Sequence, residues 1–359
     1  MWKFTLFIYL ICVNSYALPL SISNKPHFSF NQIGTLDACA VYKKRRDSIN
    51  CNPANFKSSS YEGMVFHLTT KTDGDSVDTG KELLFEPISE SNLRDIFELN
   101  AFSSWDANSI IEFRTTLFYL SYEPIYTSAN FFLYNPAFPE VSLNLSSQRR
   151  INITVGEEFK FLSYNVLSFG TNVNYFERRY FSGTFALLDV SGSGVDELIN
   201  FKKTSGINAD VGLTYQSTYS KYIPIISVQM RNLGAIHEIN NEKVKSEKFI
   251  EPILLYETYT KIDVGYDLTL DYGSLGFAVS LPYNKDMSEL YTDYITSSVS
   301  YSLWDFEVMG ASSLYTQMMA IKFASPMNAI GIYFGKSKAI GNFLDDYENY
   351  AGVTLEIYL

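Results

Sequence analysis

The sequence predicts an all-β protein that folds as a closed antiparallel transmembrane β-barrel. Three observations support this prediction: an N-terminal segment typical of exported proteins, a high content of aromatic residues, and a series of segments in which apolar and polar residues alternate. The alternating segments are about ten residues long, which suits a tilted strand that crosses a bilayer.

Residues 1–17 have the features of a cleavable signal peptide. Lys3 provides a short positive start, and residues 4–13 form a largely apolar run. The sequence Ser15-Tyr16-Ala17 places small residues at the positions that a signal peptidase reads, so we expect cleavage after Ala17. The apolar run is shorter than the roughly 20 residues that span a membrane. Export combined with the predicted β-barrel indicates the outer membrane of a Gram-negative cell as the expected location.

The composition favours a barrel. The chain has 27 Tyr and 27 Phe, so 16% of its residues are aromatic, and barrels place aromatic rings at both interfaces of the bilayer. A soluble β-sandwich with a tyrosine-rich surface is the alternative that composition leaves open. The net charge is −11, and the densest basic run is the short segment 43–46. No nucleic-acid partner is expected, because phosphate binding needs a concentrated basic patch.

Cys39 and Cys51 are the two cysteines that follow the signal peptide. In an exported protein such a pair predicts a disulfide. The rival interpretation is a metal site completed by His27 or His67, but the spacing fits no standard zinc pattern. We therefore expect a disulfide, no metal and no cofactor.

Strand patterns dominate from about Tyr61 to the C-terminus. The clearest lies at 261–270, where Ile, Val, Tyr and Leu share one face, and Lys, Asp, Gly and Thr share the other. In a barrel the apolar face would contact lipid, the polar face would line the lumen, and closure would leave no unpaired backbone in hydrocarbon. Further runs lie at 114–122, 141–145, 151–155, 158–168, 171–187, 206–217, 223–231, 274–282, 294–303, 306–323 and 328–336.

The last strand resembles the C-terminal signal by which the barrel-assembly machinery recognises its substrates. Its aromatic residue stands one place before the end, instead of at the final position. The expected partners are therefore this machinery and outer-membrane lipid. The residues that carry the insertion signal are Gly352, Val353, Leu355, Ile357, Tyr358 and Leu359.

One stretch, 89–99, breaks the strand pattern. Leu93, Ile96 and Phe97 recur at helical spacing, and Ser91 or Asn92 offers an N-cap. We expect a short helix here that either plugs the lumen or caps one end of the barrel.

Two motifs resemble the FadL-like superfamily of outer-membrane barrels. The segment 47–54, Asp-Ser-Ile-Asn-Cys-Asn-Pro-Ala, resembles the Asn-Pro-Ala-ending segment that precedes the first strand of these proteins. The segment 206–215, followed by 230–234 and by Glu251-Pro252, is similar to their mid-barrel pattern. The resemblance is nearest to the branch that contains the TraF-type and PorV-type barrels.

The resemblance implies a barrel of about 14 strands, formed by residues 59–359, with residues 18–58 folded into the lumen as a hatch. Asp47, Asn52, Pro53 and Ala54 would form the junction between the hatch and the wall; the alternative is an ordinary Asn-Pro turn. The glycines and alanines that the family carries upstream are largely replaced here by the residues at 38–46. We expect the disulfide to take over their role.

No enzymatic activity is expected. The chain has no nucleophile elbow, no His-Glu metalloprotease motif and no glycine-rich phosphate loop. His67 could belong to a catalytic triad, but a luminal or interfacial histidine is the better interpretation.

The resemblance favours passive transport of a hydrophobic or small amphipathic solute across the outer membrane. The alternative is a non-transporting barrel that binds a periplasmic or surface protein in secretion, conjugation or surface assembly. The carboxylates of Asp263, Asp267 and Asp271 on one predicted strand favour this alternative, because they do not suit an apolar path.

Overall fold

The computed structural model describes residues 29–43, 45, 47–58, 62–73, 102–134, 140–161, 164–186, 202–220, 222–238, 258–283, 295–314, 316–338 and 347–359. The expected signal peptide, the first part of the expected hatch and the helix expected near 89–99 lie outside these residues. No helix among the described residues is long and apolar enough to cross a membrane.

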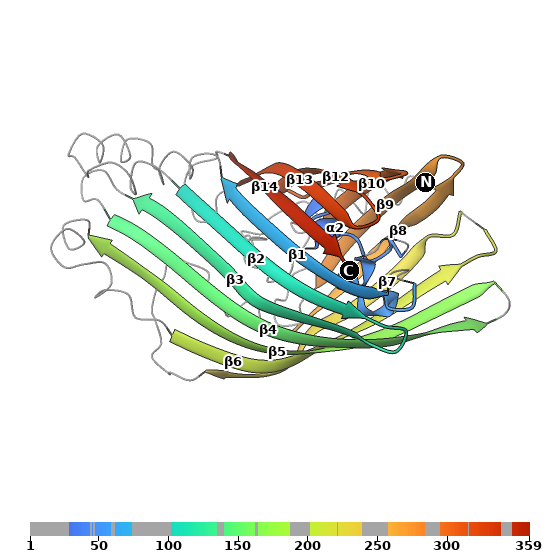
Figure 1. Ribbon diagram of the computed structural model, residues 1–359, viewed down its shortest axis with the longest axis horizontal. Helices are drawn as coiled ribbons and strands as arrows, with labels where there is room; N and C mark the ends of the chain where they lie inside the picture. The colour runs from blue at the N-terminus through green and yellow to red at the C-terminus, as the bar shows by residue number, and fades with distance from the viewer. Residues whose placement is uncertain are drawn as a thin grey trace, which may run out of the picture.

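Fourteen antiparallel strands form one closed barrel, which confirms the predicted fold class (Figure 1). Each strand pairs with its neighbours in the sequence, and β1 closes the barrel by pairing with β14. The strands are β1 (Gly63–Asp73), β2 (Phe102–Arg114), β3 (Tyr119–Tyr134), β4 (Glu140–Phe161), β5 (Asn165–Ala186), β6 (Lys202–Ser217), β7 (Ile225–Glu238), β8 (Tyr259–Leu270), β9 (Gly273–Tyr283), β10 (Thr296–Leu303), β11 (Phe306–Ser312), β12 (Thr316–Ala324), β13 (Asn328–Lys338) and β14 (Tyr347–Tyr358).

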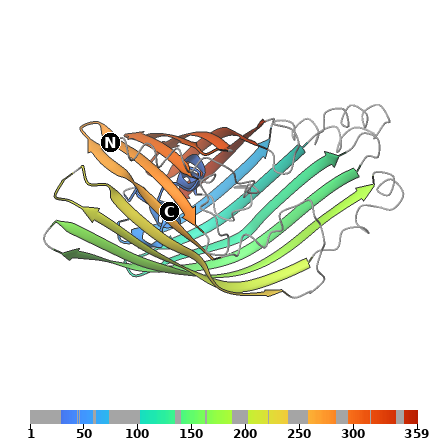
Figure 2. The same ribbon diagram turned by 180° about the vertical axis from the view of Figure 1, so that it is seen from behind.

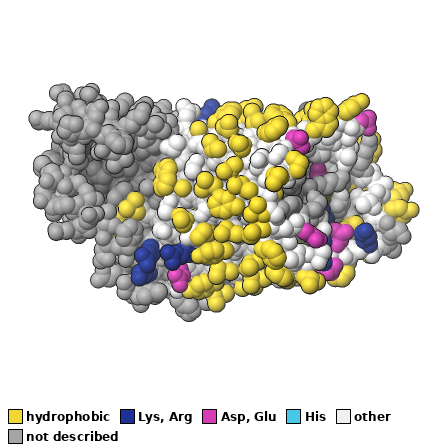
Figure 3. Space-filling model, in the orientation of Figure 1, with side chains coloured by type: hydrophobic (Ala, Val, Ile, Leu, Met, Phe, Trp, Pro, Cys, Tyr) yellow, Lys and Arg dark blue, Asp and Glu magenta, His cyan; other side chains and the backbone are white. Residues whose placement is uncertain are grey.

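Alternation along the strands separates a lipid-facing surface from the lumen. In β8, Lys261 and Asp263 are buried, whereas Ile262 and Val264 are exposed. The same holds in β14, where Val353 and Ile357 face outward and Tyr358 faces inward. Figure 3 shows the result as a band of apolar side chains across the middle of the barrel.

The strands differ widely in length around the roughly ten residues that the sequence suggests. β4 and β5 have 22 residues each, whereas β11 has 7. A strand of the former length extends about 70 Å along its own direction, far more than an apolar band of about 25 Å requires. The long strands therefore extend beyond the band, and Figure 1 shows β4 and β5 reaching farther than β1 and β14 at the left of the view.

Three of the expected strand runs are wrong because each includes a hairpin turn between two strands. The runs 114–122, 158–168 and 306–323 each contain the end of one strand and the start of the next. The turns carry apolar residues, Leu117, Tyr164 and Leu314 among them, so the alternation continues through the turn and hides it.

Residues 29–58, here called the inner segment, lie inside the barrel (Figures 1 and 2). This segment contains α2 (Phe30–Gly34), α3 (Ser48–Cys51) and the 3-10 helix η2 (Pro53–Asn55). Its apolar side chains pack against the inner face of the wall in three clusters. The first joins Phe30, Ile33 and Leu36 to β11, β12 and β13; the others join Tyr42 to Ile225 and Ala278, and Phe56 to Tyr119.

Candidate functional site

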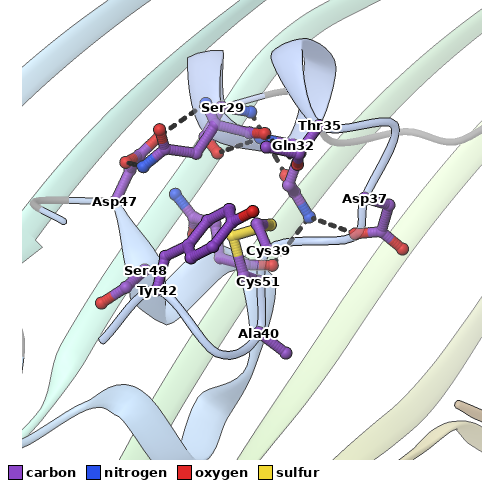
Figure 4. The surroundings of a disulfide bond; sticks show 12 residues. Ser29, Gln32, Thr35, Asp37, Cys39, Ala40, Tyr42, Asp47, Ser48 and Cys51 are labelled. Atoms are coloured by element: carbon purple, nitrogen blue, oxygen red, sulfur yellow. Dashed lines mark hydrogen bonds between the residues drawn. A yellow bond between two sulfur atoms is a disulfide. The ribbon is translucent and has the colours of Figure 1, made fainter. Parts of the chain in front are cut away.

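The disulfide that the sequence predicts joins Cys39 to Cys51 inside the lumen, with their Cα atoms 5.6 Å apart (Figure 4). Both cysteines are fully buried, against Val41 and Tyr42. The bond closes a loop that lies within the inner segment. It therefore fixes the shape of this segment and does not tie it to the wall.

Asp47 joins the two α-helices of the inner segment. Its carboxylate accepts a hydrogen bond from the Asn31 backbone N–H at 3.1 Å and another from the Asn31 side chain. Gln32 completes a capping box with Ser29 and donates to the Asn50 carbonyl at 2.7 Å. The structure thus places Asp47 between the two helices, where its charge also interacts with Arg114 and Lys322 of the wall.

The segment Asn52-Pro53-Ala54 rests directly on the wall. Asn52 Oδ1 accepts a hydrogen bond from the Ala54 N–H at 2.8 Å, and Asn52 Nδ2 donates to Ser227 Oγ at 2.5 Å and to Thr214 Oγ1 at 3.2 Å. The Asn-Pro turn is therefore also a contact with β6 and β7.

Two glycines of the wall make this contact possible. A Cβ atom on Gly212 would lie 1.8 Å from Asn52 Oδ1, and one on Gly170 would lie 2.1 Å from the Pro53 carbonyl oxygen. Any side chain at either position would displace the Asn-Pro-Ala turn. Gly212 belongs to the mid-barrel motif at 206–215, so the two motifs quoted from the sequence meet in the structure.

Ion pairs link the inner segment to β7, β8 and β11. The Asp37 carboxylate lies 3.3 Å from Arg231 Nη1 and 3.2 Å from Lys261 Nζ, and Arg231 Nη2 donates to the Cys51 carbonyl at 3.0 Å. Arg45 Nη1 lies 2.6 Å from Glu307 Oε1. Each pair is buried, so breaking one would leave an uncompensated charge inside the barrel.

A bulge in β7 positions Arg231. The β6–β7 register shifts between Ala209 and Val211, and Asn232 has a left-handed backbone with φ of 59°. The Asn232 N–H donates to Asp210 Oδ1 at 2.9 Å. The Asp210 carboxylate thus accepts a hydrogen bond from a backbone group at the interruption of the ladder. A bulge redirects the side chains of its strand.

A second polar cluster surrounds Glu112 in the lumen. Its carboxylate lies 2.6 Å from Arg114 Nη2 and 3.1 Å from His67 Nε2, and it accepts hydrogen bonds from Tyr119 at 2.7 Å and from Asn50 at 3.0 Å. His67 faces inward from β1, as the luminal interpretation predicts, with its second ring nitrogen 3.8 Å from Glu356. Asn50 makes this cluster another anchor for the inner segment.

Burial shifts the pKa of two titratable groups of the inner segment. Lys43 donates a hydrogen bond from Nζ to Ser168 Oγ at 3.1 Å, and desolvation lowers the pKa of its amine, an effect that the charge of Glu158 partly offsets. Burial also raises the pKa of the Tyr42 hydroxyl, whose oxygen lies 2.8 Å from Ser298 Oγ.

The wall has a further interruption in β3. The β2–β3 register shifts between Ser109 and Ile111, and the β3–β4 register shifts between Glu123 and Tyr126. One extra residue is therefore accommodated in β3 beside Pro124, which has no N–H to donate to the ladder. Glu123 faces the lumen, 3.3 Å from Arg150 Nε, while Ile125 faces outward and is 56% exposed.

The sequence identified some of these residues and missed others. Cys39, Cys51, Asn52 and Pro53 were singled out from the sequence, and Gly212 and Arg231 were quoted only as parts of motifs. Several wall residues, Glu112, Lys261, Ser227 and Glu307 among them, carried no signal beyond their place on a polar strand face. Their roles depend on contacts across the lumen.

No protein-family model matches the chain, and no curated protein matches it in sequence. Solved structures match its fold. A FadL homologue from Pseudomonas aeruginosa aligns with a TM-score of 0.50 and 8% identity, over 93% of this chain and 98% of that chain. The toluene transporter TbuX of Ralstonia pickettii aligns with a TM-score of 0.48 and 11% identity, over 94% and 99% of the two chains. The toluene transporter TodX of Pseudomonas putida aligns at 0.47 and 8%, over 93% and 98%.

At these identities the likeness concerns the fold alone. The chain has a FadL-like barrel along nearly its whole length, and this part of the resemblance drawn from the sequence is confirmed. With its apolar outer band, this is the architecture of an outer-membrane barrel.

Proposed function

We propose that the barrel is a passive conduit through which a hydrophobic or small amphipathic solute crosses the outer membrane. The observation that carries this proposal is the bulge of β3 at Pro124. A conduit for such a solute needs a place where the wall can open sideways, and a bulge that contains a proline weakens the ladder to both neighbouring strands.

The surroundings of the bulge suit this role. On the outside, the bulge lies beside the apolar side chains of Ile111, Ile125 and Ile151, and the exposed Arg149 stands opposite it in β4. On the inside, Glu123 and Arg150 present polar groups at the same level. A solute with one polar and one apolar end would find a partner for each end across a single strand of the wall, which favours small amphipathic molecules over purely apolar ones.

Uptake into liposomes that contain the purified protein tests the proposal. Deleting Pro124 removes the extra residue and restores strict alternation between Glu123 and Ile125. We expect this deletion to reduce uptake of an aromatic alcohol severalfold, whereas Pro124→Ala, which keeps the extra residue, retains most of it. Equal uptake by the deletion variant and the wild type, or wild-type uptake no faster than that of empty liposomes, would contradict the proposal.

The second candidate is a barrel that binds a protein partner without transport, as in the TraF-type and PorV-type branch. The ion-paired inner segment favours it, because Asp37, Arg45 and Asn50 each hold a charged group of the wall. The same liposomes discriminate between the candidates. Absence of uptake, combined with repeated recovery of one protein after cross-linking in cells, would favour the partner-binding barrel.

A further inference from the structure

We propose that Arg149, Arg179 and Lys203, on the outer surface of β4, β5 and β6, form a binding site for the phosphate groups of a lipid in the outer leaflet. All three side chains are exposed and belong to the outward-facing series of their strands. They are neighbours in the sheet: Arg179 stands opposite Lys203, and Arg149 stands opposite Glu177. We call these three residues the cationic trio.

The trio lies at the border of the apolar band. On the outward faces, Ile151 follows Arg149 directly, whereas Glu177 and Ser205 stand between the other two cations and the band. The band begins there with Ile151, Tyr175 and Ile207, which are cross-strand neighbours. Figure 3 shows Lys and Arg side chains gathered at this edge of the band, on the side of the long strands. A cation at such a border lies at the depth of lipid headgroups, whereas its aliphatic stem can remain among acyl chains.

The connections between strands identify the leaflet. At the opposite end of the barrel the strands are joined by short turns, such as 271–272 and 304–305. At the end nearer the trio the connections are longer, and they include 74–101, 187–201 and 239–258. In outer-membrane barrels the short turns face the periplasm and the longer loops face outward. The trio therefore lies in the outer leaflet.

The charges of the trio are not balanced within the described part of the protein. Arg179 and Lys203 are like charges directly opposite one another on adjacent strands, an arrangement that destabilises a sheet. No described carboxylate forms an ion pair with any of the three cations. Glu177 is the acidic neighbour, and one of its oxygens accepts a hydrogen bond from the Tyr175 hydroxyl at 2.7 Å.

Elsewhere on the described surface, exposed charges of both signs occur. Carboxylates lie at the turn end, at Glu157, Asp271 and Asp305, and single lysines lie at Lys160 and Lys336. The whole chain has a net charge of −11. A local excess of cations at one edge of an acidic protein matches an anionic headgroup layer on that side only. A phosphate between the two arginines and the lysine would accept charge-assisted hydrogen bonds and relieve the repulsion between Arg179 and Lys203.

Binding of lipid A to the purified full-length chain in detergent tests the proposal. The test variant is Arg149→Gln/Arg179→Gln/Lys203→Gln, and Lys57→Gln at the turn end is the control. Loss of even one charged hydrogen bond corresponds to about tenfold in affinity, so we expect the triple variant to bind diphosphoryl lipid A at least about tenfold more weakly. The control, and a variant that exchanges arginine and lysine within the trio, should stay close to the wild type.

Two further probes separate a lipid phosphate from other ligands. Dephosphorylated lipid A should bind the wild type as weakly as diphosphoryl lipid A binds the triple variant, and inorganic phosphate at millimolar concentration should not displace the lipid. Equal binding of both lipids would overturn the proposal. Displacement by inorganic phosphate would assign the site to the free ion and would overturn the lipid assignment.

The variant Arg179→Gln provides a test that does not require the triple variant to fold. Without lipid, its thermal midpoint should exceed that of the wild type, because the like-charge pair is removed. With diphosphoryl lipid A, the wild type should gain more stability than the variant. The difference between their thermal midpoints should therefore shrink or reverse. A variant that is less stable than the wild type without lipid, or that gains as much from lipid A, would contradict the proposal.

Discussion

Asn52 anchors the inner segment with both ends of its amide. Its oxygen caps η2 through the Ala54 N–H, and its nitrogen binds Ser227 and Thr214 of the wall. It is fully buried, and Gly212 leaves the space that it occupies. A single side chain therefore serves the local turn and the contact with the barrel at once.

Replacing Asn52 with alanine should loosen the inner segment. The change leaves several buried polar groups without their partner, at a cost of about 1–3 kcal/mol. We expect faster hydrogen exchange at the amides of 48–56, measured by mass spectrometry, while the strands keep their protection. Lys57→Ala is the control, because Lys57 is exposed and its pair with Glu157 spans 3.6 Å at the surface; it should change exchange little. Equal exchange rates in the two variants would refute the role of Asn52.

Lys43 predicts a pH dependence. Because burial lowers the pKa of its amine below the unfolded value of about 10.4, the unfolded chain binds more protons than the folded one between these two pKa values. Stability then rises with pH across this interval and falls as pH drops through the folded-state pKa. The thermal midpoint of the wild type should therefore rise more between pH 8 and 10 than that of Lys43→Met. Both proteins keep Tyr42, so its ionisation cancels in the comparison; identical slopes would contradict the argument.

At the scale of elements, the inner segment is too short to have a core of its own. α2 and α3 have five and four residues, and their apolar side chains pack on the wall. Isolated helices of this length are not stable in water. The disulfide and the capping interactions fix the segment locally, and the barrel provides the remaining packing.

Removal of the disulfide should therefore affect the inner segment and spare the barrel. For a loop of this size the entropic model gives about 3 kcal/mol. We expect the double variant Cys39→Ser/Cys51→Ser to become sensitive to a protease within 29–58, whereas the folded barrel keeps its anomalous migration in unheated gels. The reduced wild type is the matched control and should behave in the same way. Protease resistance equal to that of the oxidised wild type would contradict this view of the segment.

The sequence predicts the strands well because alternation reports directly on the two sides of a wall. It fails at the turns, since Leu117 and Tyr164 keep the apolar pattern where the chain reverses. It also fails for contacts across the lumen. Nothing local connects Asp37 with Arg231, or Asn50 with Glu112, because these pairs depend on where the closed barrel brings its inner faces. The disulfide could be predicted because only two cysteines follow the expected signal peptide.

At the scale of the molecule, the barrel is a wall of unequal height with a filled interior. The strands around β4 and β5 extend beyond the apolar band, and the inner segment lies within the lumen (Figure 1). Three sets of polar contacts, centred on Asn52, Asp37 and Glu112, join that segment to the neighbouring strands β6, β7 and β8 and to β2. We propose that this segment obstructs the lumen.

Ion conductance in planar bilayers tests this claim most directly. The full-length mature chain is compared with a variant that lacks residues 18–58, after both are shown to migrate as folded barrels. If the inner segment obstructs the lumen, we expect no sustained current through the full-length chain and discrete conductance steps through the variant. A folded variant that stays as non-conducting as the full-length chain, or a full-length chain that conducts as well as the variant, would contradict it.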